Sequence, residues 1–197
     1  FNFAQGALVL FAALTFVSLQ AMGLPFWGSL LATLVIMVGM GIAIERVVLR
    51  PLVNQPPITL FMATIGLSFF IEGLAQLVWG TEVHGLELGI TDEPFEVAGV
   101  FISRFDLFAA GLSALLVAVL AAFFQYTKLG RALRAVADDH QAALSVGIPL
   151  QHIWAVVWGV AGFVALVSGL LWGSRLGVQF ALTLVVLKAL PEIGRAH

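Results

Sequence analysis

A few polar side chains of this chain stand inside long apolar runs, where they would lie within a membrane. Glu72 is a carboxylate in such a run, and we expect it to face the interior of a helix bundle, neutralised or hydrogen-bonded. Asn2 and Gln5 lie three residues apart and therefore share one face of a helix. With Thr64 and Ser68, these groups could line the path of a small polar solute across a bilayer. Close packing between helices is the competing role.

Enzymatic chemistry has much less support in the sequence. No glycine-rich phosphate loop followed by Lys and Ser or Thr occurs, so we do not expect this chain to hydrolyse ATP. No Ser/His/Asp or His/Glu constellation gathers within an apolar run, and we predict no catalytic residue. His84 and His140 are isolated in polar segments, and cysteine is absent. We therefore predict no metal site and no cofactor bound by this chain.

The composition indicates the class of protein that surrounds these groups. Hydrophobic residues make up 61% of the 197 residues and charged residues 10%, whereas a soluble domain has about 25% charged residues. The mean hydropathy is +1.07. We therefore predict an all-α fold, a polytopic transmembrane helical bundle. The net charge is −2, and no basic face with interleaved aromatic residues occurs, so nucleic-acid binding is not expected.

Apolar runs close to the length that a helix needs to cross a bilayer predict about six spans. These runs are 3–22, 30–49, 58–79, 107–126, 153–172 and the beginning of a sixth at 178–190. Gly23, Leu24 and Pro25 form a tight break after the first run. The segment 81–104 is too polar to cross a membrane, and its end at 97–105 is compatible with a short strand or an interfacial segment.

The distribution of charge predicts the orientation of these spans, because Lys and Arg favour the cytoplasmic side. Basic residues flank the runs on one side of the membrane: Arg46, Arg50, Lys128, Arg131 and Arg134. The opposite side carries the acidic segment 81–104. We therefore expect the loop 127–152 to be cytoplasmic and the loop 81–104 to face outward.

The cytoplasmic loop contains an unusually polar stretch, GRALRAVADDHQAALSVGI at 130–148. We expect a helix from about 131 to 146, with Gly147 and Pro149 as stop signals. One explanation is a helix that lies on the membrane surface with its basic residues near anionic lipid. Mixed charges and the small residues Ala142 and Ala143, with Gly147 four residues later, favour a surface that docks on a protein.

This stretch also belongs to a wider resemblance. With NFAQGA at 2–7, ATIGLSFFIEGLAQLVWG at 63–80 and, more weakly, GLLWGSRLGVQFALTLVVLKAL at 169–190, the chain resembles the permease subunits of branched-chain amino acid ABC importers, a group that includes urea-type permeases. The resemblance implies a multi-pass subunit of a bacterial-type inner membrane that itself binds no ATP. ATP would be bound by separate ATPase subunits.

The same resemblance implies partners and roles for residues. The partners are ATPase subunits, a second permease subunit that is identical or homologous, an external solute-binding protein and membrane lipid. The residues implied to couple the chain to the ATPase are Gly130, Arg131, Arg134, Asp138, Gln141, Ala142, Ala143 and Gly147. Gln141 stands where the family usually has Glu, and Ala7 where it usually has an acidic residue.

Other interpretations remain open at this point. A secondary transporter driven by an ion gradient would use Glu72 to bind its coupling ion. A small structural or assembly subunit is a third possibility. The solute can be a leucine-type amino acid, urea or another amide. We expect residues 1–191 to be a permease domain truncated at both ends, and 192–197 to be a non-native tail.

Overall fold

A computed structural model describes residues 2–52, 55–86, 88–89, 94–97, 100–138 and 150–188 of the chain. Contacts divide the chain into two compact units, Phe1–Leu86 with Ala155–His197, and Glu87–Trp154. The expected permease domain, 1–191, stays a prediction, and the expected non-native tail, 192–197, lies outside the described residues.

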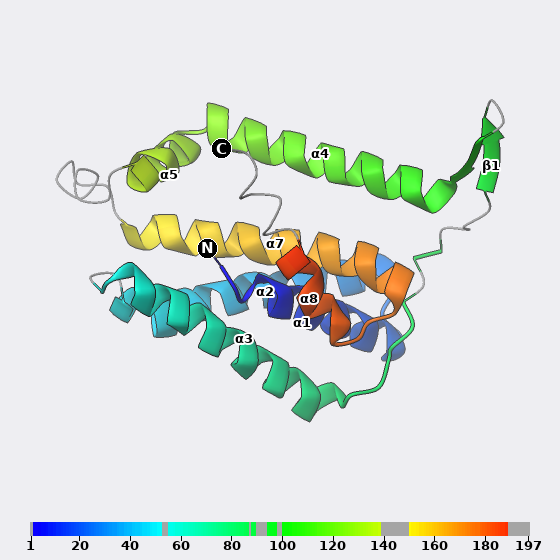
Figure 1. Ribbon diagram of the computed structural model, residues 1–197, viewed down its shortest axis with the longest axis horizontal. Coiled ribbons are helices and arrows are strands. Elements are labelled where there is room, and N and C mark those ends of the chain that lie inside the picture. Colours follow the sequence, from blue (N-terminus) through cyan, green and yellow to red (C-terminus); the bar gives the residue numbers. More distant parts are fainter. Residues whose placement is uncertain are drawn as a thin grey trace. The chain divides into compact units, whose positions relative to one another are not determined.

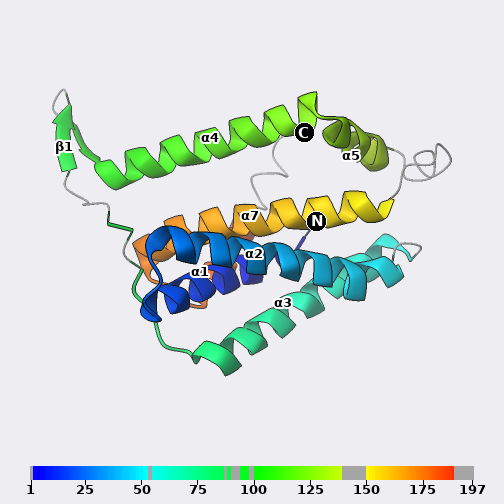
Figure 2. The same cartoon turned by 180° about the vertical axis from the view of Figure 1, so that it is seen from behind.

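The first unit is a bundle of helices gathered around α1 (Figures 1 and 2). The helix α1 (Gln5–Ala21) contacts α2 (Phe26–Ile44), α3 (Pro57–Trp79) and α8 (Ala181–Lys188). Along its part in this unit, α7 (Leu150–Leu176) lies against α1 and α2.

The second unit holds a β-hairpin and two consecutive helices. The strand β1 (Pro94–Val97) pairs antiparallel with β2 (Val100–Ser103). β2 leads directly into α4 (Arg104–Tyr126), and α5 (Lys128–Asp138) follows. Of the two alternatives for the end of the segment 81–104, the structure therefore has the short strand.

α1 is buried on every side along most of its length. All its residues from Gly6 to Phe16 are buried except Phe11, which packs edge-on against Trp79 with ring centroids 5.2 Å apart. The helix is therefore surrounded by protein rather than by lipid.

α2 buries only one stripe of its surface. Ser29, Thr33, Met37 and Gly41 are buried and recur at every fourth position, a spacing that places them on one helix face. At the C-terminal end of α2, the helical path does not stop at Ile44. It continues through a π-helical turn, η1 (Glu45–Leu49), and a 3-10 turn, η2 (Arg50–Leu52).

Glycines on α2 and α7 bring the two helix backbones into close contact. A Cβ added at Gly41 would lie 2.8 Å from the carbonyl oxygen of Trp158, and one added at Gly162 would lie 3.0 Å from that of Met37. On α7, a Cβ at Gly169 would lie 2.7 Å from the carbonyl oxygen of Val9 in α1. Larger side chains at these positions would force the helices apart.

Turn-forming residues mark the helix ends. Gly23 has φ +90°, in the left-handed region, and Pro25 is extended just before α2, so the predicted break at 23–25 is confirmed. Pro57 occupies the first position of α3, where its missing N–H costs no hydrogen bond. α3 ends at Gly80, which has φ +76°.

Four helices in the described part of the chain are long and apolar enough to cross a membrane: Phe26–Leu52, Ile58–Trp79, Arg104–Tyr126 and Ala155–Leu176. The remaining two predicted spans correspond to α1, with 17 residues, and α8, described over 8 residues. The predicted all-α, polytopic membrane fold is confirmed, and the number of spans is approximate.

Several predicted boundaries were wrong. α4 begins at Arg104 rather than at 107, and α7 extends beyond the predicted 153–172 at both ends. α2 begins at Phe26 rather than at 30, because it starts immediately after Pro25. The sixth helix begins at Ala181 rather than at 178, because the backbone of Val178 pairs with His84 through N···O distances of 3.0 and 2.7 Å. This bridge ties the segment after α3 to the turn between α7 and α8.

The close contact between α2 and α7 makes a testable prediction. Gly41→Ala should lower the stability of the full-length protein, because overpacking costs about 1–3 kcal/mol. Gly39→Ala is the matched control, since a Cβ there meets nothing within 4 Å, and it should leave stability unchanged or raise it by up to about 1 kcal/mol. Thermal unfolding in detergent measures both variants, and equal midpoints would contradict the close contact.

Candidate functional site

Asn2 and Gln5 form a small polar cluster at the start of α1. The Asn2 Nδ2 atom donates to Gln5 Oε1 at 3.2 Å, and Asn2 Oδ1 accepts from the backbone N–H of Ala4 at 3.1 Å. Gln5 Nε2 donates to the carbonyl oxygen of Ala161 in α7 at 3.1 Å. The two side chains meet, but the predicted shared helix face is wrong, because Asn2 lies in the turn before α1, which begins at Gln5. Gln5 joins α1 to α7.

The other predicted pathway residues lie on α3. The Ser68 hydroxyl donates to Glu72 Oε1 at 3.2 Å, so the predicted hydrogen bond to this carboxylate is present, although Glu72 is half-buried rather than buried. Thr64 is buried and its hydroxyl donates to the carbonyl oxygen of Phe61 in its own helix at 2.9 Å. Thr64 therefore fits the packing role better than Ser68 and Glu72 do.

The two polar clusters lie on neighbouring helices. α1 and α3 are in contact, and the rings of Phe3 and Phe61 meet edge-on with centroids 4.8 Å apart. Within the described residues, no hydrogen bond joins Asn2 or Gln5 to Ser68 or Glu72. The structure thus brings the predicted residues together in two pairs rather than in one site.

Sequence reasoning missed Glu45, which is only 4% exposed and opens the π-helical turn η1. A buried carboxylate in a membrane helix is costly and marks a site worth testing. The feature of the sequence that could have indicated Glu45 is its position at the end of an apolar run, directly before Arg46.

The predicted ATPase-coupling stretch begins with α5, at a sharp corner after α4. Thr127 caps α5: its hydroxyl accepts from the N–H of Gly130 at 2.9 Å and donates to the carbonyl oxygen of Phe123 at 2.7 Å. Gly130 is buried, and a Cβ there would lie 2.5 Å from both Phe123 O and Phe124 Cα. Only glycine fits at this corner.

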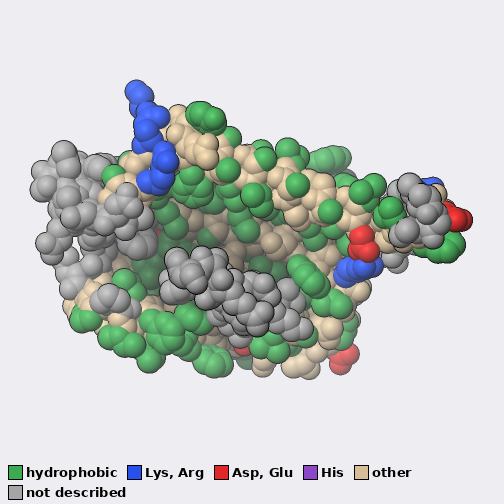
Figure 3. Space-filling view, turned by 45° about the horizontal axis from the view of Figure 1, so that its top comes forward, with side chains coloured by type: hydrophobic (Ala, Val, Ile, Leu, Met, Phe, Trp, Pro, Cys, Tyr) green, Lys and Arg blue, Asp and Glu red, His purple; other side chains and the backbone are tan. Residues whose placement is uncertain are grey.

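Two of the predicted coupling residues bind the end of α4. Arg131 Nη1 donates to the carbonyl oxygen of Tyr126 at 3.2 Å, and Arg134 Nη2 donates to that of Gln125 at 3.4 Å. Cations favour a helix C-terminus, where carbonyl groups lack partners. Both Arg side chains and that of Lys128 are nevertheless exposed, and Figure 3 shows Lys and Arg side chains gathered at this corner.

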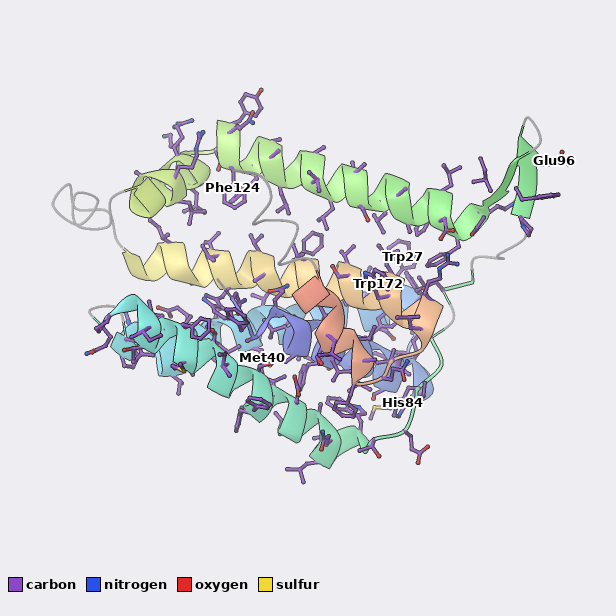
Figure 4. The ribbon with its side chains drawn as sticks, viewed as in Figure 1. Trp27, Met40, His84, Glu96, Phe124 and Trp172 are labelled. Atoms are coloured by element: carbon purple, nitrogen blue, oxygen red, sulfur yellow. The ribbon has the colours of Figure 1, made fainter. Side chains whose placement is uncertain are left out.

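The apolar side of α5 points the other way from these cations. Leu133 is buried, and α5 contacts α4 near Phe124, which Figure 4 labels. Asp138 is the last residue of α5, which begins at Lys128, three residues earlier than predicted. The remaining predicted coupling residues lie outside the described residues: Gln141, Ala142, Ala143 and Gly147.

The comparisons with known proteins bear on this arrangement. A family model described as branched-chain amino acid transport system / permease component matches residues 1–190. The chain belongs to this permease family. The family is a permease component rather than an enzyme, which confirms the resemblance drawn from the sequence and the assignment to membrane transport.

Curated relatives carry the same description. The high-affinity branched-chain amino acid transport system permease protein LivH of Salmonella typhimurium is 26% identical over 193 residues. LivH of Escherichia coli is 25% identical over 197 residues, and BraD of Pseudomonas aeruginosa is 25% identical over 190 residues. Each alignment covers 90% of this chain, and the chain spans 62% of each relative's length. No solved structure matches.

Gln5 joins α1 to α7 through a hydrogen bond, so its substitution can distinguish a structural role from a role in transport. Gln5→Leu should lower stability by about 0.5–1.5 kcal/mol for each of the two hydrogen bonds that it removes, to Ala161 and to Asn2. Gln20→Leu, at the other end of α1, is the matched control. If Gln5 also contacts solute, uptake normalised to the folded protein should fall severalfold. If uptake falls only in proportion to the amount of folded protein, Gln5 does not contact the solute.

The cap at the α4–α5 corner can be tested by removing its hydroxyl. Thr127→Val should cost about 1 kcal/mol, since it deletes an N-cap, whereas Thr127→Ser should retain most of the stability. Hydrogen exchange of the α5 amides in the full-length protein reports the local effect. Equal protection in both variants would contradict the capping role.

Proposed function

We propose that this chain is the transmembrane permease subunit of an ATP-driven importer for branched-chain amino acids or related small solutes. In this proposal a separate ATPase binds and hydrolyses ATP, and α5 with the residues after it, 139–147, docks on that ATPase. The permease family and the names of the relatives support the class of transporter and of solute. The docking role is supported by the α4–α5 corner.

The observation that carries the proposal is the way α5 is fastened to α4. The Thr127 cap, the buried Gly130 and the hydrogen bonds of Arg131 and Arg134 join the two helices at several points. A displacement of α5 would therefore be transmitted to α4 rather than absorbed by a hinge. An ATPase that binds two positions of α5 with different affinity would shift the population of the permease between two states.

The orientation completes the proposal. The exposed cations of α5 favour the cytoplasmic side, where an ATPase is available, and the segment 81–104 then faces outward. A solute-binding protein would deliver solute at that outer face, beside a second permease subunit. Inside the bundle, Asn2, Gln5, Ser68 and Glu72 supply donors and acceptors for the polar groups of an amino acid.

One observation favours a second candidate, a transporter driven by an ion gradient. Such a transporter needs acidic groups within its spans to bind the coupling ion. Glu45 is buried in η1 and Glu72 is half-buried in α3, so two carboxylates are available. Uptake that persists without ATPase and follows a proton or sodium gradient would favour this candidate.

Co-purification of the full-length permease with its ATPase tests the proposal. Gly130→Leu should distort the corner, and Ala143→Arg should place a bulky cation on the docking surface. Both variants should reach the membrane but recover at least tenfold less ATPase from detergent. Gly111→Leu is the matched control for the glycine, because a Cβ at Gly111 meets nothing within 4 Å. Full recovery of ATPase with both variants would refute the docking role.

A further inference from the structure

An apolar groove lies on the first unit between the end of α2 and α3. Its volume is about 450 Å³, within the range of about 300–1,000 Å³ typical of small-molecule pockets. Residues that line it include Met40, Val47, Val48, Ala63, Gly66 and Phe70. Met40 is labelled in Figure 4. All the side chains along the groove are apolar, which sets the chemistry of what it can hold.

The lining excludes the transported solute as the occupant. A zwitterionic amino acid would lose its hydration in the groove without gaining a hydrogen-bonding partner, which is costly. A hydrocarbon chain has no such requirement. The groove also opens on two helices that are long and apolar enough to cross a membrane, so acyl chains of the bilayer are the apolar groups present there at the highest concentration.

Basic residues flank, in the sequence, the two valines through which η1 lines the groove. Val47 and Val48 line the groove and lie between Arg46 and Arg50 in the sequence, and both Arg side chains are exposed. These residues end α2 on the side that the distribution of basic residues assigns to the cytoplasm. A guanidinium group binds a phosphate group through paired, charge-assisted hydrogen bonds.

We propose that this groove binds an anionic phospholipid of the cytoplasmic leaflet, with one acyl chain in the groove and its phosphate group at Arg46 and Arg50. The acyl chain fills the space between α2 and α3 from Val48 toward Met40. The two Arg residues select for the anionic headgroup. All the residues named for this site belong to this chain, so the proposal depends on neither the ATPase nor the transported solute.

Native mass spectrometry of the full-length permease complex, released from detergent, tests this site. The probes are phosphatidylglycerol and phosphatidylcholine at equal concentration. Gly66→Leu should fill the groove without disturbing its helix, because a Cβ at Gly66 meets nothing within 4 Å. The matched control is Gly111→Leu, at an equally open position on α4. The double variant Arg46→Gln with Arg50→Gln tests the headgroup contact.

The expected results differ between the variants. Gly66→Leu should reduce the most tightly held adducts of both lipids at least fivefold, and Gly111→Leu should leave them unchanged. The double Arg variant should keep phosphatidylcholine adducts but lose the preference for phosphatidylglycerol. Unchanged adducts in Gly66→Leu would overturn the proposal. The proposal would also be overturned if Gly66→Leu separated the two permease subunits and left lipid binding unchanged. That result would identify the groove as a subunit interface.

Discussion

Close contact between helix backbones is the interaction on which the first unit depends. In a membrane the hydrophobic effect does not drive helices together, because lipid is as apolar as their side chains. Small residues must therefore bring the helices near enough for dispersion and short polar contacts. Gly41 and Gly162 do this between α2 and α7, Gly169 between α7 and α1, and Gly6 between α1 and the carbonyl oxygen of Thr183 in α8.

The second unit is organised by polar groups at its helix ends instead. The apolar side chains of α4 are exposed along the helix, as Leu107, Leu115 and Val119 show. At its start the Ser103 hydroxyl accepts from the N–H of Asp106 at 3.1 Å, and at its end Thr127 continues the chain into α5. A long apolar helix with fixed ends is well suited to transmit a displacement.

The sequence was sufficient to predict where the helices lie in the chain, but not which of them are buried in protein. Apolar runs located the spans, whereas the helix face predicted for Asn2 and Gln5 was wrong, because α1 begins only at Gln5. Burial was a different matter: α1 and α4 are similarly apolar, yet one is enclosed by protein and the other is exposed. The burial of Glu45 depends on a π-helical turn, and the pairing of His84 with Val178 joins residues far apart in the chain. Neither leaves a local pattern in the sequence.

The central place of α1 has a consequence for the order in which the protein is made. Its neighbour α8 is synthesised about 160 residues after α1, which takes about 8–32 s at ribosomal rates. During that interval α1 must remain in the bilayer with much of its surface against lipid. A polar face suited to its final neighbours would oppose this insertion. The predominantly apolar surface of α1 therefore meets a requirement of biogenesis, and its two amide side chains, Gln5 and Gln20, lie at the two ends of the helix.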